Sequence, residues 1–275
     1  MDLAKLNLTE KQEKQICDII LNSNNIHKEL EKFLKKNSIR KTIDRKSVTK
    51  DLIWYIINKY KLTEYKCIPR YDNTTPYTQE EFDVIVGGLL GDTWIGKRKN
   101  GKNPEGSFTH KLEHYEYAKY KYELLKRRCS NFTIHNKTDK RSNRHYQQVF
   151  CKLAASSLLE PIYQAFYKNG IKIISEEYIN KLSPLGIAIW YMDDGGICSN
   201  SFKFSVDCFT ESDINLLQKM LLTKFNIKTT KEINQNKIIY VLNESKETFK
   251  KLVQPYICKC MEYKLIPYSE ITGRH

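Results

Sequence analysis

SPLGIAIWYMDDGGI, residues 183–197, places two acidic residues at the end of an apolar segment. Its initial Ser-Pro pair is typical of a helix start, because serine caps helices and proline is tolerated at the first helical position. The apolar residues that follow predict a short buried helix, with Asp193 and Asp194 at its C-terminal end. Gly195 and Gly196 then end the helix, where we expect a left-handed cap. Carboxylates are unfavourable at this negative end of a helix unless a cation joins them, so the pair indicates a cation site.

A second stretch has the same design. DVIVGGLLGDTWIG, residues 83–96, is mostly apolar up to a Gly-Asp pair, after which strand-like residues begin. When the two stretches are aligned, Asp92 corresponds to Asp194, 102 residues further along the chain. One copy alone would be interpreted as an ordinary core helix with a polar end. Two copies at this spacing favour an internal duplication, in which each of two similar halves contributes one aspartate.

The composition favours a nucleic-acid partner. The 275 residues include 46 Lys and Arg against 32 Asp and Glu, a net charge of +14. Such an excess suits a polyanion; the alternative is the Lys- and Asn-rich usage of an A/T-rich genome. We expect a soluble intracellular protein, because we find no signal peptide and no apolar run of roughly 20 residues. The A/T-driven composition favours a mitochondrion or another organelle, although a virus or bacterium would look similar. The eight cysteines form no CxxC pair, so we expect free thiols rather than a zinc site.

Residues 1–78 lack a copy of the acidic stretch and are expected to form a helical, basic N-terminal extension. Three helices are predicted, at residues 10–21, 26–36 and 48–60, with a basic segment at residues 35–50. This outline fits an accessory DNA-binding module that resembles a helix-turn-helix, and it fits a structural cap on the rest of the chain equally well.

The remainder divides into two halves, residues 79–172 and 173–275, with the same predicted order of elements. After the acidic helix of the first half we expect strands at 93–99 and 107–111, a helix at 113–128, strands at 132–136 and 145–152, and a helix at 154–169. After the acidic helix of the second half we expect strands near 197 and at 202–209, a helix from Thr210 to 224, strands at 227–233 and 237–242, and a helix at 245–253. Both halves therefore have the order α-β-β-α-β-β-α, which defines an α+β fold class. Two such halves would pair about a pseudo-twofold axis, with the acidic helices at the seam.

The two acidic stretches resemble the motifs of the LAGLIDADG homing endonucleases, of the single-chain kind with two motifs that organellar introns encode. The first motif is IVGGLLGDT (residues 85–93) and the second is IAIWYMDDG (residues 187–195). The resemblance covers residues 80–268, and Thr93 stands where the family usually has its final glycine. It implies paired motif helices between saddle-like antiparallel sheets, in a monomer that binds and cuts double-stranded DNA.

The paired motifs predict a metal site. Glycines in the first motif would let the partner helix approach closely, which sets Asp92 and Asp194 side by side. Two carboxylates at that distance repel each other unless they bind a metal or share a proton. Their hard oxygen atoms favour Mg²⁺, with Mn²⁺ as a substitute. By resemblance, the carbonyl groups of Gly91 and Asp193 also bind the metal, whereas we expect the Asp193 side chain to bond locally.

The resemblance also implies one lysine from each half near the metal. Lys172, ahead of the second motif, and Lys264, near the C-terminus, match these positions. The expected catalytic residues are therefore Asp92, Asp194, Lys264 and Lys172. Polar hairpin residues that face the metal would order water, and the candidates are Ser107, Thr109, Ser205 and Asp207.

The hairpins are expected to contact DNA, because alternate residues of a curved sheet can point into the major groove. Residues 95–146 contain 14 Lys and Arg against 5 Asp and Glu, so the first half has the more basic surface. Any one of these residues could instead contact phosphate without discriminating between bases. The candidate DNA-binding residues are Lys97, Arg98, Lys99, Lys102, Lys140, Arg141, Arg144, Lys203, Lys228, Lys231 and Lys237.

Together these patterns predict a site-specific, Mg²⁺-dependent double-strand DNA endonuclease. Because the two halves differ, its target should be long and non-palindromic. The resemblance implies intron homing, by cleavage across the minor groove that leaves short 3′ overhangs. The alternatives on the same fold are an RNA maturase for a group I intron and a DNA-binding regulator that does not cleave. Retention of an aspartate in both motifs favours the endonuclease.

Overall fold

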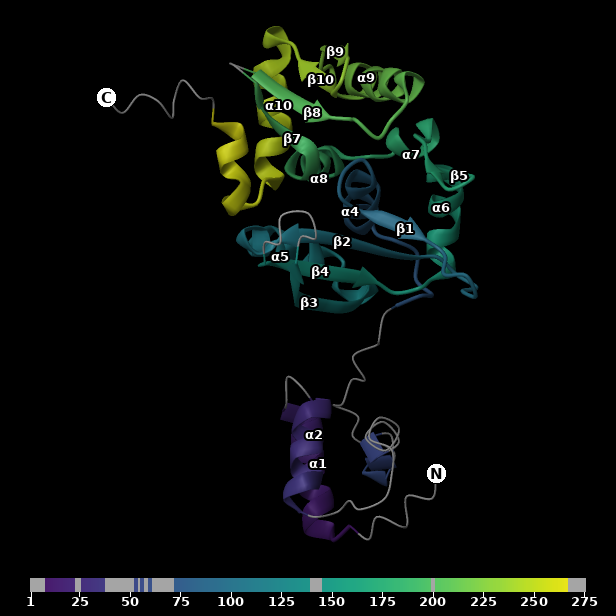
Figure 1. Ribbon diagram of the computed structural model, residues 1–275, viewed down its shortest axis with the longest axis vertical. Coiled ribbons are helices and arrows are strands. Elements are labelled where there is room, and N and C mark those ends of the chain that lie inside the picture. Colours follow the sequence, from purple (N-terminus) through teal and green to yellow (C-terminus); the bar gives the residue numbers. More distant parts are fainter. Residues whose placement is uncertain are drawn as a thin grey trace, which may run out of the picture. The chain divides into compact units, whose positions relative to one another are not determined.

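The computed structural model describes residues 8–22, 26–37, 52–53, 55–56, 59–60, 72–138, 145–198 and 201–266. The chain divides into two compact units, residues 1–69 and 70–275. Described elements of the first unit are helical, whereas the second combines helices and antiparallel sheets (Figure 1). Among the described residues, no helix is both long enough and apolar enough to cross a membrane.

The first unit contains the helices α1 (Glu10–Asn22) and α2 (Ile26–Lys36), close to their predicted ranges. Thr9 begins α1, since its Oγ1 accepts a hydrogen bond of 3.3 Å from the backbone N–H of Gln12. The unit has a hydrophobic core of its own, which includes Ile16, Cys17, Ile20, Leu30, Leu34, Leu52, Ile53 and Ile56. Most of the basic segment and much of the third predicted helix lie outside the described residues.

Two motif helices, α4 (Gln79–Leu89) and α8 (Pro184–Asp194), lie side by side at the centre of the second unit (Figure 1). Two four-stranded antiparallel sheets flank them, with equivalent strand orders, β1-β2-β4-β3 and β7-β8-β10-β9. The first sheet consists of β1 (Trp94–Gly96), β2 (Glu105–Lys111), β3 (Cys129–Thr138) and β4 (His145–Leu153). The second consists of β7 (Gly195–Cys198), β8 (Ser201–Ser205), β9 (Thr229–Ile233) and β10 (Lys237–Val241).

The remaining helices complete two similar halves. The first half contains α5 (Tyr115–Leu124) and α6 (Glu160–Phe166), and the second contains α9 (Glu211–Phe225) and α10 (Lys246–Val253). A short helix, α7 (Glu176–Ile179), precedes α8. Both halves have the order α-β-β-α-β-β-α, so the predicted fold class is confirmed.

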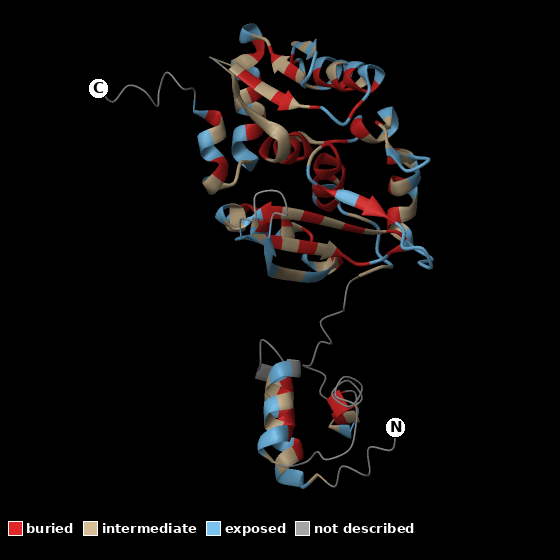
Figure 2. Cartoon of the chain, in the orientation of Figure 1, coloured by how far each residue is buried: buried red, intermediate tan, exposed pale blue. Residues whose placement is uncertain are grey.

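Each sheet has one face toward the core and one outer face, as the alternating colours along its strands show (Figure 2). In β2, Gly106, Phe108 and His110 are buried and the residues between them are partly exposed. The outer face of the first sheet includes Ser107, Thr109, Lys111, Thr133, Gln148, Phe150 and Lys152. The outer face of the second includes Lys203, Ser205, Thr230, Glu232, Ile238 and Tyr240.

The motif helices are buried almost all round (Figure 2). Every residue from Leu185 to Met192 is buried in α8, and so is every residue from Asp83 to Leu89 in α4. A helix that is covered on all sides needs no polar face, so its sequence loses the amphipathic period. This burial explains why both motifs are nearly uniform apolar runs.

The end of α8 differs from the expected left-handed cap. Gly195 is extended, with φ −86° and ψ 163°, and it begins strand β7 directly. The glycine is needed there for space rather than for a positive φ, because a Cβ at this position would overlap the side chain and carbonyl oxygen of Tyr191.

The segment before the second motif also differs from the prediction. The helix predicted at residues 154–169 is shorter, and a two-stranded hairpin follows it, formed by β5 (Tyr167–Lys168) and β6 (Ile171–Lys172). Asn169 and Gly170 turn this hairpin with positive φ values of 52° and 78°. The hairpin is too short for its strands to show a period in the sequence, and it is the element that carries Lys172.

Candidate active site

The two motif helices touch along their length and run in the same direction. Near their N-terminal ends, the Asp83 carboxylate accepts hydrogen bonds from the Ser183 backbone N–H at 2.8 Å and from its hydroxyl at 2.5 Å. One turn further on, Gly87 lies against the backbone of Gly186, so closely that a Cβ on Gly87 would overlap the Gly186 carbonyl. The C-terminal ends of both helices therefore meet at one place, as the sequence predicts.

Asp92 and Asp194 stand at this meeting point, and their surroundings raise the pKa of both carboxyl groups. Burial, followed by the charges of Asp92 and Asp193, raises the pKa of Asp194 to about 7. Burial and the Asp193 carboxylate likewise raise the pKa of Asp92, although its side chain is 42% exposed. Three neighbouring carboxylates thus concentrate negative charge that a cation would offset.

One lysine caps the end of each motif helix. The Lys172 amino group donates to the carbonyl oxygen of Leu89 at 2.7 Å, with longer contacts to Gly91 at 3.5 Å and Thr93 at 3.3 Å. In the other half, the Lys264 amino group donates to the Met192 carbonyl at 2.6 Å and lies 3.4 Å from that of Asp193.

These two lysines therefore occupy equivalent places at the negative ends of the two helices. Burial lowers the pKa of Lys172 and of Lys264, and the nearby carboxylates oppose that shift. The structure thus brings Asp92, Asp194, Lys172 and Lys264 together in one site, as the sequence predicts.

The sequence predicts that the Asp193 side chain bonds locally, and this prediction is wrong. In the structure the side chain bonds across the seam between the two halves. Its carboxylate is fully buried and accepts hydrogen bonds from the Tyr117 hydroxyl at 2.7 Å and the Lys121 amino group at 2.9 and 3.0 Å. It also accepts one from the backbone N–H of Asp92 at 3.2 Å. The Asp193 carboxylate can reach across because Gly91, which faces it from the first motif, has no side chain and leaves room for it.

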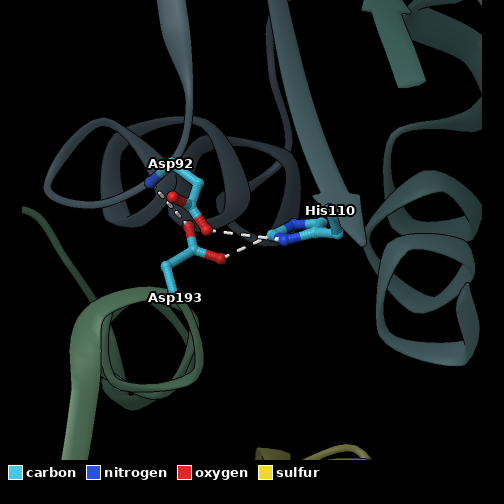
Figure 3. Close-up of side chains that lie close together, drawn as sticks. All are labelled: Asp92, His110 and Asp193. Atoms are coloured by element: carbon cyan, nitrogen blue, oxygen red, sulfur yellow. Dashed lines mark hydrogen bonds and ion pairs between the residues drawn. The ribbon is translucent and has the colours of Figure 1, made fainter. Parts of the chain in front are cut away.

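His110 is a site residue that the sequence reasoning missed. It extends from β2 toward both aspartates, as Figure 3 shows, with Nδ1 3.4 Å from Asp92 Oδ2 and Nε2 3.8 Å from Asp193 Oδ1. Burial and the charge of Lys121 lower its pKa to about 3, so the imidazole is neutral at physiological pH. The available signal was its position two residues after Phe108, at an inward place in the strand alternation.

Asp92, His110 and Asp193 have potential ligand atoms within 4.8 Å of one another (Figure 3). The Lys121 amino group, however, lies 2.9 Å from Asp193 and 3.5 Å from His110 Nε2. It provides the positive charge that a metal would bring, so we interpret this trio as part of a hydrogen-bond network rather than as a metal site.

A cavity of about 260 Å³ opens beside the site, and Asp92, Thr109 and Lys264 are among the residues that line it. Thr109, one of the four candidates for ordering water, therefore lies beside the site. Asp207 is engaged elsewhere, because its carboxylate accepts a 2.6 Å hydrogen bond from the backbone N–H of Lys237. Ser107 and Ser205 lie on the outer faces of the two sheets.

The basic residues predicted to contact DNA in the first half follow β1 in the loop at residues 97–104, which includes Lys97, Arg98, Lys99 and Lys102. Lys97 is paired with Glu160 at 2.8 Å and Arg98 with Glu105 at 2.9 Å. Lys99 and Lys102 are exposed. The predicted contacts Lys140, Arg141 and Arg144 lie outside the described residues.

In the second half, only part of the predicted set lies on the outer face. Lys203 is on that face of β8, and Lys228 is exposed just before β9, 3.1 Å from Glu244. Lys231 bonds to Glu211 and Asn215 of α9, each at 2.6 Å, and Lys237 donates to the Phe209 carbonyl at 2.6 Å. These two lysines therefore lie on the helix-covered face, because the alternation of the strands puts them in register with buried Ile239 and Val241.

The fold thus pairs two motif helices between two antiparallel sheets, with one motif aspartate at the end of each helix. Residues 82–252 match the LAGLIDADG DNA endonuclease family, and the chain belongs to this family.

Relatives with sequence similarity carry different names. The chain is 31% identical over 210 residues to the cytochrome b mRNA maturase bI2 of Saccharomyces cerevisiae, a match that covers 72% of this chain and 50% of that protein. It is 28% identical over 207 residues to the DNA endonuclease I-ChuI of Chlamydomonas applanata, covering 68% of this chain and 95% of that protein. The chain thus spans half the length of the first relative and nearly all of the second.

Among solved structures, the homing endonuclease I-WcaI bound to its DNA recognition sequence has the same fold. The TM-score is 0.65 at 23% identity, and the match covers 77% of this chain and 92% of that one.

Proposed function

We propose that this protein is a monomeric, site-specific double-strand DNA endonuclease that hydrolyses phosphodiester bonds with Mg²⁺ at a long, non-palindromic target. The observation that carries the proposal is the paired arrangement of Asp92 with Lys172 and Asp194 with Lys264 at the joined ends of α4 and α8. Each half thus offers one carboxylate and one amino group, which suits a reaction at two strands. Its composition, rich in Lys, Asn, Ile and Tyr, supports an organellar location, most simply a mitochondrion.

The donor set fits Mg²⁺. Hard carboxylate oxygens are available from Asp92 and Asp194, and backbone carbonyls from Gly91 and Asp193 lie at the same helix ends. The shortest bonds of the two lysines go to other carbonyls, so the carbonyls of Gly91 and Asp193, at 3.5 and 3.4 Å from the amino groups, keep capacity for a cation. Mn²⁺ would accept the same oxygen ligands. The bound ion would activate a water and neutralise charge on the phosphate.

The chain's own residues would hold and orient the DNA. Lys172 and Lys264 place positive charge beside the carboxylates, where the cut phosphates would lie. Lys97, Arg98, Lys99, Lys102, Lys203 and Lys228, with Lys140, Arg141 and Arg144, are proposed phosphate and base contacts. Lys231 and Lys237 are left out of this set because they lie on the helix-covered face. Cleavage across the minor groove with short 3′ overhangs remains part of the proposal through the family.

The test is cleavage of a supercoiled plasmid that carries the intronless sequence flanking the reading frame. We expect linear product with Mg²⁺, none with a chelator, and no linear product from Asp92→Asn or Asp194→Asn, although both variants still retard the target duplex in a gel. Near-normal cutting by either variant would remove that aspartate from the site.

A maturase is the second candidate, because a relative that matches 72% of the chain at 31% identity is named an mRNA maturase. The discriminating measurement compares the affinity of the protein for its group I intron RNA with its affinity for the plasmid target. An uncut plasmid together with tight, splicing-competent RNA binding would favour the maturase over the endonuclease.

A further inference from the structure

We propose that His110 is a positioning residue that acts on Asp92 and leaves Asp194 unaffected, so that the two strand cuts depend unequally on one side chain. This inference rests on the proposed endonuclease function. It follows from a hydrogen-bond network that the first half possesses and the second half lacks.

The proton of His110 can be assigned from its neighbours. Nε2 lies 3.5 Å from the Lys121 amino group, which can only donate while it is charged. Nε2 therefore accepts, since its alternative partner, Asp193 Oδ1, is 3.8 Å away. With Nε2 accepting, the ring carries its proton on Nδ1, which lies 3.4 Å from Asp92 Oδ2. His110 would thus present an N–H donor to the Asp92 carboxylate.

Lys121 fixes the other side of this ring. Its side chain is completely buried, its amino group bonds both oxygens of Asp193, and it lies 4.5 Å from the centre of the Phe108 ring. Burying an ion pair costs desolvation energy, so the pair is better explained by the geometry that it imposes than by added stability. Through it, α8 of the second half determines where His110 sits against Asp92.

The sheet registers identify the residues that stand in place of His110 and Lys121 in the second half. Trp94, two residues after Asp92, pairs with Ser107 in the first sheet. Gly196, two residues after Asp194, pairs with Lys203 in the second. Ser107 therefore corresponds to Lys203, and equivalent residues in this part of the two halves are 96 positions apart. His110 therefore corresponds to Val206, and Lys121 corresponds to Leu217; both counterparts are apolar and fully buried.

The two motifs complement this difference. The residue before the motif aspartate is Gly91 in the first motif and Asp193 in the second. The second motif thus supplies the carboxylate that binds Lys121, and the first motif leaves the space that this carboxylate occupies. The backbone N–H of Asp92 consequently bonds to Asp193, and the Asp92 carboxylate lies 3.4 Å from Nδ1 of His110. Loss of His110 should release the Asp92 carboxylate directly, whereas Val206, its counterpart in the second half, offers Asp194 no such donor to lose.

The test uses full-length protein and a target duplex labelled on one strand or the other, under single-turnover conditions with Mg²⁺. His110→Val copies the residue of the second half. We expect it to slow the cut of one strand at least tenfold more than the other, so that nicked plasmid accumulates. His110→Asn, whose amide can donate in place of Nδ1–H, should restore much of the balance.

A readout independent of cleavage is the tautomer of His110. In metal-free protein with ¹⁵N-labelled histidine, assigned by comparison with His110→Asn, we expect a protonated Nδ1 and a bare Nε2. A protonated Nε2, or an equal slowing of both strands by a folded His110→Val, would overturn the inference. If the wild type cuts no DNA, the proposed function fails, while the tautomer still tests the network.

Discussion

Asp193 and Asp194 are neighbours in the chain, yet their surroundings make them different chemical groups. The Asp193 carboxylate has no exposed surface and accepts bonds from Tyr117, Lys121 and the Asp92 backbone. Asp194 is partly exposed, and burial together with neighbouring carboxylates raises its pKa to about 7. Asp193, whose carboxylate has hydrogen-bond partners and a buried counter-charge, is suited to a structural role. Asp194, whose negative charge is poorly compensated, is suited to binding a cation.

This contrast predicts unequal effects of two adjacent substitutions on stability. Asp193→Asn leaves Lys121 buried without its counter-charge, which should lower the free energy of unfolding by about 3–5 kcal/mol. Asp194→Asn removes repulsion from Asp92 and should leave stability unchanged or raise it. Denaturant unfolding in the absence of Mg²⁺ measures both. Equal destabilisation by the two variants would contradict the assigned roles.

The two aspartates of the site were predictable from the sequence because motif positions carry them, and the two lysines because the family resemblance implies one in each half. His110 and Lys121 were not, because they come from a strand and a helix whose sequences show no motif. What makes them important is the contact with Asp193, 72 residues beyond Lys121 in the chain. The same limit applies to Lys231 and Lys237, since basic residues look alike in sequence whether they face solvent or a helix.

At the scale of elements, the closeness of α4 and α8 decides how the site assembles. We predict that Gly87→Ala lowers the free energy of unfolding by about 1–3 kcal/mol or more, because the added Cβ would overlap the Gly186 carbonyl and the backbone cannot yield cheaply. Cleavage should fall as well, since the helix ends would separate. Gly196→Ala is the matched control for stability, because the nearest heavy atom to its new Cβ is Lys203 Cε at 3.9 Å. Equal melting temperatures of the two variants would show that the helix contact is looser than described.

The start of α4 predicts a pH dependence. Burial alone would raise the pKa of Glu81, but hydrogen bonds from Arg127 and Arg128 more than offset it and lower the pKa to about 2. Because the folded-state pKa lies below the unfolded value, this carboxylate stabilises the fold above pH 4.5 and loses its contribution as the pH falls toward 2. Wild type should therefore exceed Glu81→Gln in unfolding free energy by at most roughly 3 kcal/mol at pH 7. The difference should shrink between pH 4.5 and pH 2 in parallel unfolding curves, and a constant difference would contradict the assignment.

Most elements were predictable because hydrophobic period and turn residues agree with the final structure. The Thr210 cap is an example, with its hydroxyl accepting from the Asp213 N–H and the Asp213 carboxylate accepting in return. The hairpin that carries Lys172 was not predictable, because two strands of two residues each leave no period. The glycine at the end of α8 was misread for another reason: its role is set by Tyr191, a contact that the local rules of capping do not consider.

At the scale of the whole molecule, the chain combines two hydrophobic cores that share no residue. The core of the first unit packs around α1 and α2, where the buried Glu13 carboxylate accepts bonds from Lys59 at 2.6 Å and Tyr60 at 2.5 Å. The core of the second unit contains the motif helices and both sheets. Separate cores favour separate folding, so the units can be assigned different tasks.

We predict that residues 70–275 alone keep Mg²⁺-dependent cleavage but bind the target more weakly than the full chain. Residues 1–69 contain 15 Lys and Arg against 9 Asp and Glu, and such an excess adds phosphate contacts. Fluorescence anisotropy across a salt series should give a shallower dependence of log affinity on log salt for the shortened chain. Full-length Lys35→Gln/Lys36→Gln, which removes two exposed charges from the last turn of α2, should lie between the two. An affinity and a salt dependence that match those of the full chain would instead make residues 1–69 a structural extension.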